Sequence, residues 1–137
     1  MNARSITYWV TTALFALAIG GSGVADLVQA PPIVEGFGHL GYPVYLTTLL
    51  GVWKVLGVVA ILAPRLPRLK EWAYAGFMFE LTGAAFSHVS AGEPGAAIPL
   101  ALLSVAMISW AMRPDTRLLG SLLPAAASAR TLTPAAT

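Results

Sequence analysis

The stretch LGVWKVLGVVAILAPRLPRLKEWAYAGFMFELTGAAFSHVSAG at residues 50–92 decides the fold, because it places two long apolar segments around a short basic link. A membrane helix needs about 20 mainly apolar residues to cross about 30 Å of hydrocarbon. Such segments occur at about 42–62 and 71–90, and two more occur at about 6–28 and 96–112. Four spans are too few to close a barrel, and open sheet edges are not tolerated in lipid. The sequence therefore predicts an all-α, four-helix transmembrane bundle in residues 1–115.

The composition supports a lipid bilayer as the surrounding medium. The chain has 137 residues, of which 57% are hydrophobic and only 10% charged, whereas soluble domains carry about 25% charged residues. This excludes an ordinary water-soluble enzyme. Eight Lys and Arg residues are too few to cover a duplex, so no nucleic acid partner is expected. Residues 116–137, rich in Ala, Pro, Ser and Thr, are expected to form a mobile cytoplasmic tail.

The distribution of basic residues predicts the orientation of the bundle. The loops at 29–41 and 91–95 contain no Lys or Arg, and seven of the eight basic residues flank the other ends of the spans: Arg4, Arg65, Arg68, Lys70, Arg113, Arg117 and Arg130. Positive loops stay in the cytoplasm. Both termini are therefore expected there, in a multi-pass protein of the inner (plasma) membrane. A cleaved signal peptide ending at VQA, before Pro31, is the alternative interpretation of the first span.

Two charged residues lie inside the predicted spans. Lys54 and Glu80 are expected at similar depth on neighbouring antiparallel helices, so we predict an ion pair between them. The pair either fixes the register of the helices or handles protons or orients a substrate, and both readings stay open. Small residues share a face with each charge, which predicts close helix packing there. These faces comprise Ala73, Gly76, Glu80, Gly83 and Ser87 on one span and Thr47, Gly51 and Lys54 on the other.

A second polar group is expected near the outer surface. Asp26, His88, His39 and Tyr42 would line a cavity that opens outward and offers an acid, an imidazole and a phenol for proton transfer. Contact with headgroups and water is the alternative for these residues. The candidate catalytic residues are Asp26, Glu80, His88 and Lys54, and the candidate substrate-binding residues are His39, Tyr42, Phe37, Phe15 and Trp53. No short metal-ligand spacing occurs, so neither a metal nor haem is expected.

Three segments resemble a known family. SGVADL at 22–27, VEGFGHLGYP at 34–43 and the stretch at 50–92 are similar to the DoxX-like family of small bacterial membrane proteins, over about residues 8–114. The resemblance implies a four-helix membrane bundle. Relatives in the wider group are associated with quinone-linked sulfur oxidation and with membrane redox complexes, which makes a quinone the candidate cofactor.

Carried over position by position, the family pattern would mark Gly36, Phe37, His39, Leu40, Gly41, Tyr42, Pro43, Lys54, Glu80, Gly83 and His88. One position departs from it. Asp26 stands where proteins of this kind commonly carry lysine, which puts in doubt any anion-binding role borrowed from relatives.

The sequence leaves three functions open. The first is a DoxX-like protein that works with quinones or with a redox partner. The second is a small membrane enzyme, of isomerase, cyclase or hydrolase type, that rearranges an epoxide or isoprenoid by acid/base catalysis. Its acid would be Asp26 or Glu80, and its base His88 or His39. The third is a non-catalytic scaffold subunit whose small-residue faces bind partner helices, including those of a second copy in a homo-oligomer.

Overall fold

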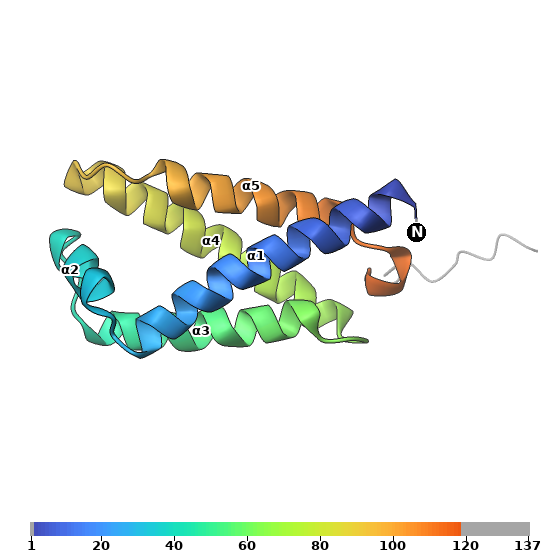
Figure 1. The fold of residues 1–137 in the computed structure, drawn as a ribbon, viewed down its shortest axis with the longest axis horizontal. Coiled ribbons are helices and arrows are strands. Elements are labelled where there is room, and N and C mark those ends of the chain that lie inside the picture. The colour runs from blue at the N-terminus through green and yellow to red at the C-terminus, as the bar shows by residue number, and fades with distance from the viewer. Residues whose placement is uncertain (1, 119–137) are drawn as a thin grey trace, which may run out of the picture.

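The computed structural model describes residues 2–118, and within this range the chain is helical without strands (Figure 1). Four long helices occupy the four segments predicted as spans. The tail expected at 116–137 lies, from residue 119 onward, outside the described residues. The elements in chain order are α1 (Ala3–Leu27), α2 (Pro31–His39), α3 (Tyr45–Leu62), α4 (Pro67–Ala91), α5 (Ala97–Ala111) and the short 3-10 helix η1 (Asp115–Arg117).

Two of these helices, α1 and α3, are both long and apolar enough to cross a membrane. Helix α5 is apolar but has 15 residues. The outer surface of the bundle carries many large apolar side chains, among them Leu17, Trp72 and Phe86, each more than 70% exposed. Exposed apolar area on this scale is typical of a surface that contacts lipid or other protein rather than water.

The long helices pack as an antiparallel bundle around one core. Helix α1 packs on α3 and α5, and α4 packs on the same two helices from the opposite side (Figure 1). The core contains Phe15, Ile19, Phe77 and Leu81, all less than 5% exposed. The rings of Phe15 and Phe77 meet edge to face, with centroids 5.1 Å apart, an arrangement that aromatic quadrupoles favour.

Proline positions explain two differences from the sequence-based boundaries. Residues 29–41 were expected to form a loop, but Pro31 and Pro32 begin the additional helix α2. Helix α4 begins at Pro67 rather than near Glu71. Proline lacks an N–H and has a fixed φ, so it suits the first turn of a helix as well as it ends the preceding one. The sequence interpretation used only the second of these effects.

The buried face of α4 also differs from the prediction. The small-residue row at 73–87 was expected to pack against neighbouring helices, but Gly76 and Gly83 are exposed, and a Cβ added to either would meet nothing within 4 Å. The adjacent row is buried instead, because its larger side chains fill the core. It comprises Lys70, Tyr74, Phe77, Leu81 and Ala85. On α3 the expected face is correct, since Thr47 and Gly51 are buried.

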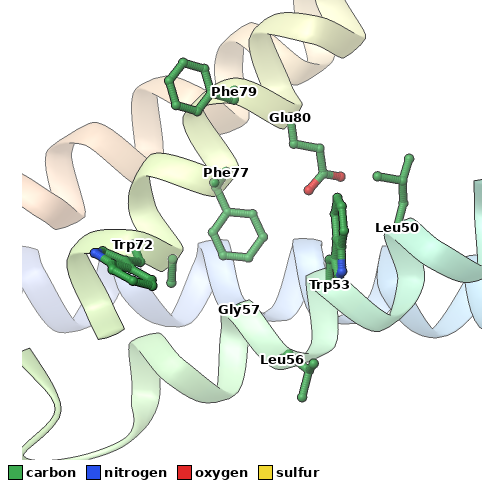
Figure 2. Close-up of a pocket in the computed structure, with 10 residues that line it drawn as sticks. Leu50, Trp53, Leu56, Gly57, Trp72, Phe77, Phe79 and Glu80 are labelled. Carbon is green, nitrogen blue, oxygen red and sulfur yellow. The ribbon is translucent and has the colours of Figure 1, made fainter. Parts of the chain in front are cut away.

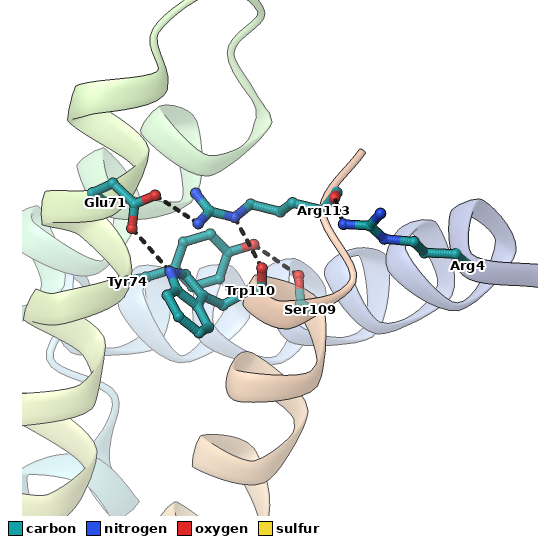
Figure 3. Close-up of polar contacts among 6 residues, drawn as sticks. All are labelled: Arg4, Glu71, Tyr74, Ser109, Trp110 and Arg113. Carbon is teal, nitrogen blue, oxygen red and sulfur yellow. Dashed lines mark hydrogen bonds and ion pairs between the residues drawn. The ribbon is translucent and has the colours of Figure 1, made fainter. Parts of the chain in front are cut away.

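Cationic side chains gather at one end of the bundle, which is called the basic end below: Arg4, Lys70, Arg113 and Arg117. Arg113 donates to Glu71 Oε1 at 2.6 Å, and Trp110 Nε1 donates to Glu71 Oε2 at 2.9 Å, which ties α5 to α4 (Figure 3). Arg4 donates to the Arg113 carbonyl at 2.8 Å. These contacts hold the start of α1, the start of α4 and the end of α5 together.

Lys70 secures the end of α3 at the same place. Its ammonium is buried and donates to the carbonyl oxygens of Ala60, Ile61 and Ala63. The last carbonyls of a helix lack partners within the helix, and a cation there also complements the helix dipole. Lys70 is therefore a C-terminal cap for α3 that is supplied by α4.

Candidate functional site

Three charged side chains meet between the helices. Lys54 of α3 donates to Asp26 Oδ2 of α1 at 2.7 Å and to Ser22 Oγ at 3.0 Å, and its Nζ lies 3.4 Å from Glu80 Oε1 of α4. The predicted ion pair between Lys54 and Glu80 is confirmed. Asp26 is the closer partner, which the sequence interpretation did not anticipate. We call Asp26, Lys54 and Glu80 the charged cluster.

Close contact between α1 and α3 makes the Asp26–Lys54 pair. A Cβ added to Gly23 would lie 2.8 Å from Lys54 Cβ, and one added to Gly51 would lie 2.8 Å from the Gly23 carbonyl oxygen. Real Cβ atoms do not approach so closely, so only glycine allows this helix spacing. The helices cross where both lack side chains, and Asp26 thereby comes within hydrogen-bond distance of Lys54.

The members of the charged cluster differ in exposure. The side chain of Asp26 is 1% exposed, that of Lys54 is 11% exposed and that of Glu80 is 19% exposed. Asp26 lies on the far side of Lys54 from the α3–α4 interface and neutralises the charge of its ammonium. Glu80 is the carboxylate that a ligand entering between α3 and α4 would meet.

A cavity of about 310 Å³, called the α2-side cavity below, opens between α3 and α4 beside the cluster. Five of the predicted site residues line it: Phe37, Tyr42, Lys54, Glu80 and His88. Most of the remaining wall is apolar, with leucines of α3 and Phe79 of α4. This volume lies at the lower limit of the range of about 300–1,000 Å³ that is usual for ligand pockets, so the cavity has room for a ring.

A second cavity of about 410 Å³ lies between the same helices toward the basic end (Figure 2). Its walls include Trp53 and Trp72, and its floor is formed by Gly57 and the ring of Phe77. The close contact there leaves no space for a side chain, because a Cβ on Gly57 would lie 2.5 Å from Phe77 Cζ. Glu80 lines both cavities and so lies at their junction. The two cavities together are called the α3–α4 groove.

Hydrogen-bonding groups gather at the α2 end of the α2-side cavity. The hydroxyl groups of Tyr42 and Ser87 are 2.6 Å apart, and Ser87 Oγ donates to the Gly83 carbonyl at 2.9 Å. His88 Nδ1 is buried and has no hydrogen-bond partner within the described part of the chain. This atom lies against Gly95 of the α4–α5 connection, where an added Cβ would come within 3.1 Å of it, so it is packed inside the protein and does not open into the cavity.

The structure separates other candidates from this cavity. His39 is exposed at the end of α2, Phe15 is in the core, and Trp53 lines the second cavity. The expected outer cavity lined by Asp26, His88, His39 and Tyr42 is therefore not formed as a unit, although Tyr42 and His88 share the α2-side cavity. The reason is the rotation of each helix about its own axis, which directs Asp26 of α1 toward Lys54 and leaves His39 of α2 at the surface.

Sequence reasoning missed two wall residues with a central position. Leu50 and Phe79 line both cavities, but an apolar side chain in an apolar helix gives no signal that distinguishes it from a lipid-facing one. Among the residues that the structure describes, no group of three or more His, Asp or Glu side chains could hold a metal ion.

The helices, their apolar outer surface and the charged cluster define the class: an α-helical membrane protein with ionisable groups between its helices. The chain belongs to the DoxX-like family, whose family model matches residues 10–112. No curated protein matches it. No solved structure matches it either.

Proposed function

We propose that this DoxX-like membrane protein binds a quinone-type redox carrier in the α3–α4 groove, with the ring beside Glu80. The observation that carries the proposal is the position of this one carboxylate at the junction of two largely apolar cavities. Ligand sites typically combine apolar walls with a few polar groups that fix orientation. The α2-side cavity has the size of a ring, and the second cavity would hold the first part of an apolar tail.

The open side of the groove supports entry from lipid. Gly83 lines the α2-side cavity and Gly76 the second cavity, and neither has a neighbour within 4 Å of an added Cβ. Because Gly76 and Gly83 have no side chains, the α4 side of the groove is open to the surroundings. Trp53 and Phe79 flank the groove and are 59% and 68% exposed. A hydrophobic ligand could therefore enter sideways without leaving the membrane.

The proposal includes the membrane arrangement expected from the sequence. All four long helices span the inner membrane, the basic end faces the cytoplasm, and the α2-side cavity lies toward the outer leaflet. The gathering of Arg4, Lys70, Arg113 and Arg117 at one end supports this orientation, because basic residues are retained on the cytoplasmic side.

Titration calorimetry with decyl benzoquinone tests the binding function on the purified full chain in detergent. Replacing Gly83 by leucine should fill the α2-side cavity and weaken binding about ten-fold or more, because the ring would lose its space. Gly21→Leu is the matched control: Gly21 is also an exposed helical glycine with nothing within 4 Å, but it lies on α1 away from the groove. Absence of binding to the unmodified protein by both decyl benzoquinone and its reduced form, decyl hydroquinone, or equal binding by both variants, would refute the proposed site.

A second candidate function is acid/base catalysis on an epoxide or isoprenoid. Glu80 and the imidazole of His88 line one cavity, which favours it. Glu80 would give a proton to a substrate oxygen and His88 would accept one. In this case Glu80→Gln and His88→Gln should each abolish turnover in a membrane assay while the fold is retained. Asp26 would act only through Lys54, so Asp26→Asn should reduce turnover less than Glu80→Gln.

A further inference from the structure

We infer that the α2-side cavity recognises its ligand through hydrogen atoms that the ligand donates. Its ligand would then be a ring that carries a hydroxyl group, a phenol or hydroquinone, rather than one that carries only carbonyl oxygens. The inference rests on the proposed function and narrows it to one form of the ligand. The basis for it is the number of hydrogen-bond donors on the cavity wall that are not already bonded to other groups of the protein.

The ammonium of Lys54 already faces three acceptors of the protein. An ammonium group has three N–H donors and no acceptor. One is directed to Asp26 at 2.7 Å, one to Ser22 at 3.0 Å, and Glu80 lies in ion-pair contact at 3.4 Å. The ligand would have to displace one of these partners to obtain a hydrogen bond from Lys54. Lys54 therefore positions Glu80 and does not itself bind the ring.

The two hydroxyl groups of the cavity also have no free hydrogen. Ser87 has one hydrogen, which it donates to the Gly83 carbonyl at 2.9 Å. Tyr42 must then be the donor in its 2.6 Å contact with Ser87 Oγ. After both bonds are made, each oxygen retains only acceptor capacity.

Glu80 adds the strongest acceptor. Its carboxylate contacts Lys54 through Oε1, whereas a carboxylate offers about four acceptor positions. Among the described residues the charged cluster also holds two carboxylates against one ammonium, so the fully ionised cluster carries one excess negative charge. A donated hydrogen bond would stabilise that charge in a largely apolar surrounding, whereas a carbonyl oxygen would face it unfavourably.

His88 can supply one donor at most. A neutral imidazole carries one N–H and one acceptor nitrogen, and since Nδ1 of His88 is closed off against Gly95, only Nε2 is left to face a ligand. The polar wall of the cavity thus offers acceptors at Glu80, Tyr42 and Ser87 against one donor at most. A ligand with hydroxyl hydrogens matches this set and a ligand with only carbonyl oxygens does not.

Three probes with the same tail test the inference by titration calorimetry on the purified full chain: decyl hydroquinone, its dimethyl ether and decyl benzoquinone. The hydroquinone should bind about ten-fold or more tightly than either of the others, since a hydrogen bond to a charged acceptor is worth about that factor. Glu80→Gln should remove most of this preference. Glu35→Gln is the control, because Glu35 is an exposed carboxylate on α2 that does not line the cavity.

Tyr42→Phe provides a second variant that puts the fold at little risk, because Tyr42 is 40% exposed. It should lower hydroquinone affinity and leave the affinity for the dimethyl ether unchanged. Equal or tighter binding of the quinone or the ether would overturn the inference and leave the proposed function intact. Failure of all three probes to bind would overturn the proposed function itself. Tighter binding of decylammonium than of the hydroquinone would assign the site to amines and also overturn the inference.

Discussion

Replacing Lys54 by methionine tests whether Asp26 depends on it. The side chain of Asp26 is 1% exposed, and its only ion pair among the described residues is the 2.7 Å contact with Lys54. Removing one partner of a buried ion pair leaves the other charge uncompensated and typically costs about 3–5 kcal/mol. For a chain of this size, that loss lowers Tm by on the order of 10 °C or more. We therefore expect Lys54→Met to unfold at a clearly lower temperature in detergent at neutral pH.

A second substitution in the Lys54→Met protein shows which of the two carboxylates, Asp26 or Glu80, is the main partner of Lys54. Lys54→Met combined with Asp26→Leu removes both buried charges and should restore most of the lost Tm, because an apolar replacement of a buried pair is often neutral. Lys54→Met combined with Glu80→Met leaves Asp26 alone and should stay low. Near-UV circular dichroism during heating would record all three transitions.

Arg68→Met is the control for the loss of a positive charge, because Arg68 is exposed at the basic end. It should unfold within about 2 °C of the unmodified protein, as expected of a surface substitution. Recovery with the Glu80 substitution but not with the Asp26 substitution would refute the assignment of Asp26 as the main partner.

Three further outcomes follow from the packing and the orientation. Gly57→Ala should lower the free energy of unfolding by about 1–3 kcal/mol through overpacking, whereas Gly76→Ala, which meets open space, should leave it within about 1 kcal/mol; denaturant titration in detergent compares them. Lys70→Met should cost about 1–3 kcal/mol in the same titration, because three helix-end carbonyls lose their donor. The chain has no cysteine, so a membrane-impermeant maleimide should label Ser90→Cys in intact cells but label Arg68→Cys only after permeabilisation; the reverse pattern would refute the proposed orientation.

The ion pair between Lys54 and Glu80 shows how far sequence reasoning reaches into the site. Equal depth on consecutive antiparallel helices depends only on counting residues along each helix, and the structure confirms the contact. The partnership of Lys54 with Asp26 could not be counted in this way. It depends on the closeness of α1 and α3, which Gly23 and Gly51 allow.

The approximate position of the four long helices and the apolar character of their outer surface were determined by the sequence alone, because the length of an apolar run is a local property. The tertiary structure alone decided which row of α4 is buried, that Asp26 lies behind Lys54 and that His39 remains outside the cavity. These features depend on the rotation of each helix about its axis. That rotation is set by the fit of large side chains such as Phe15 and Phe77 into one shared core, and no single segment of sequence contains this information.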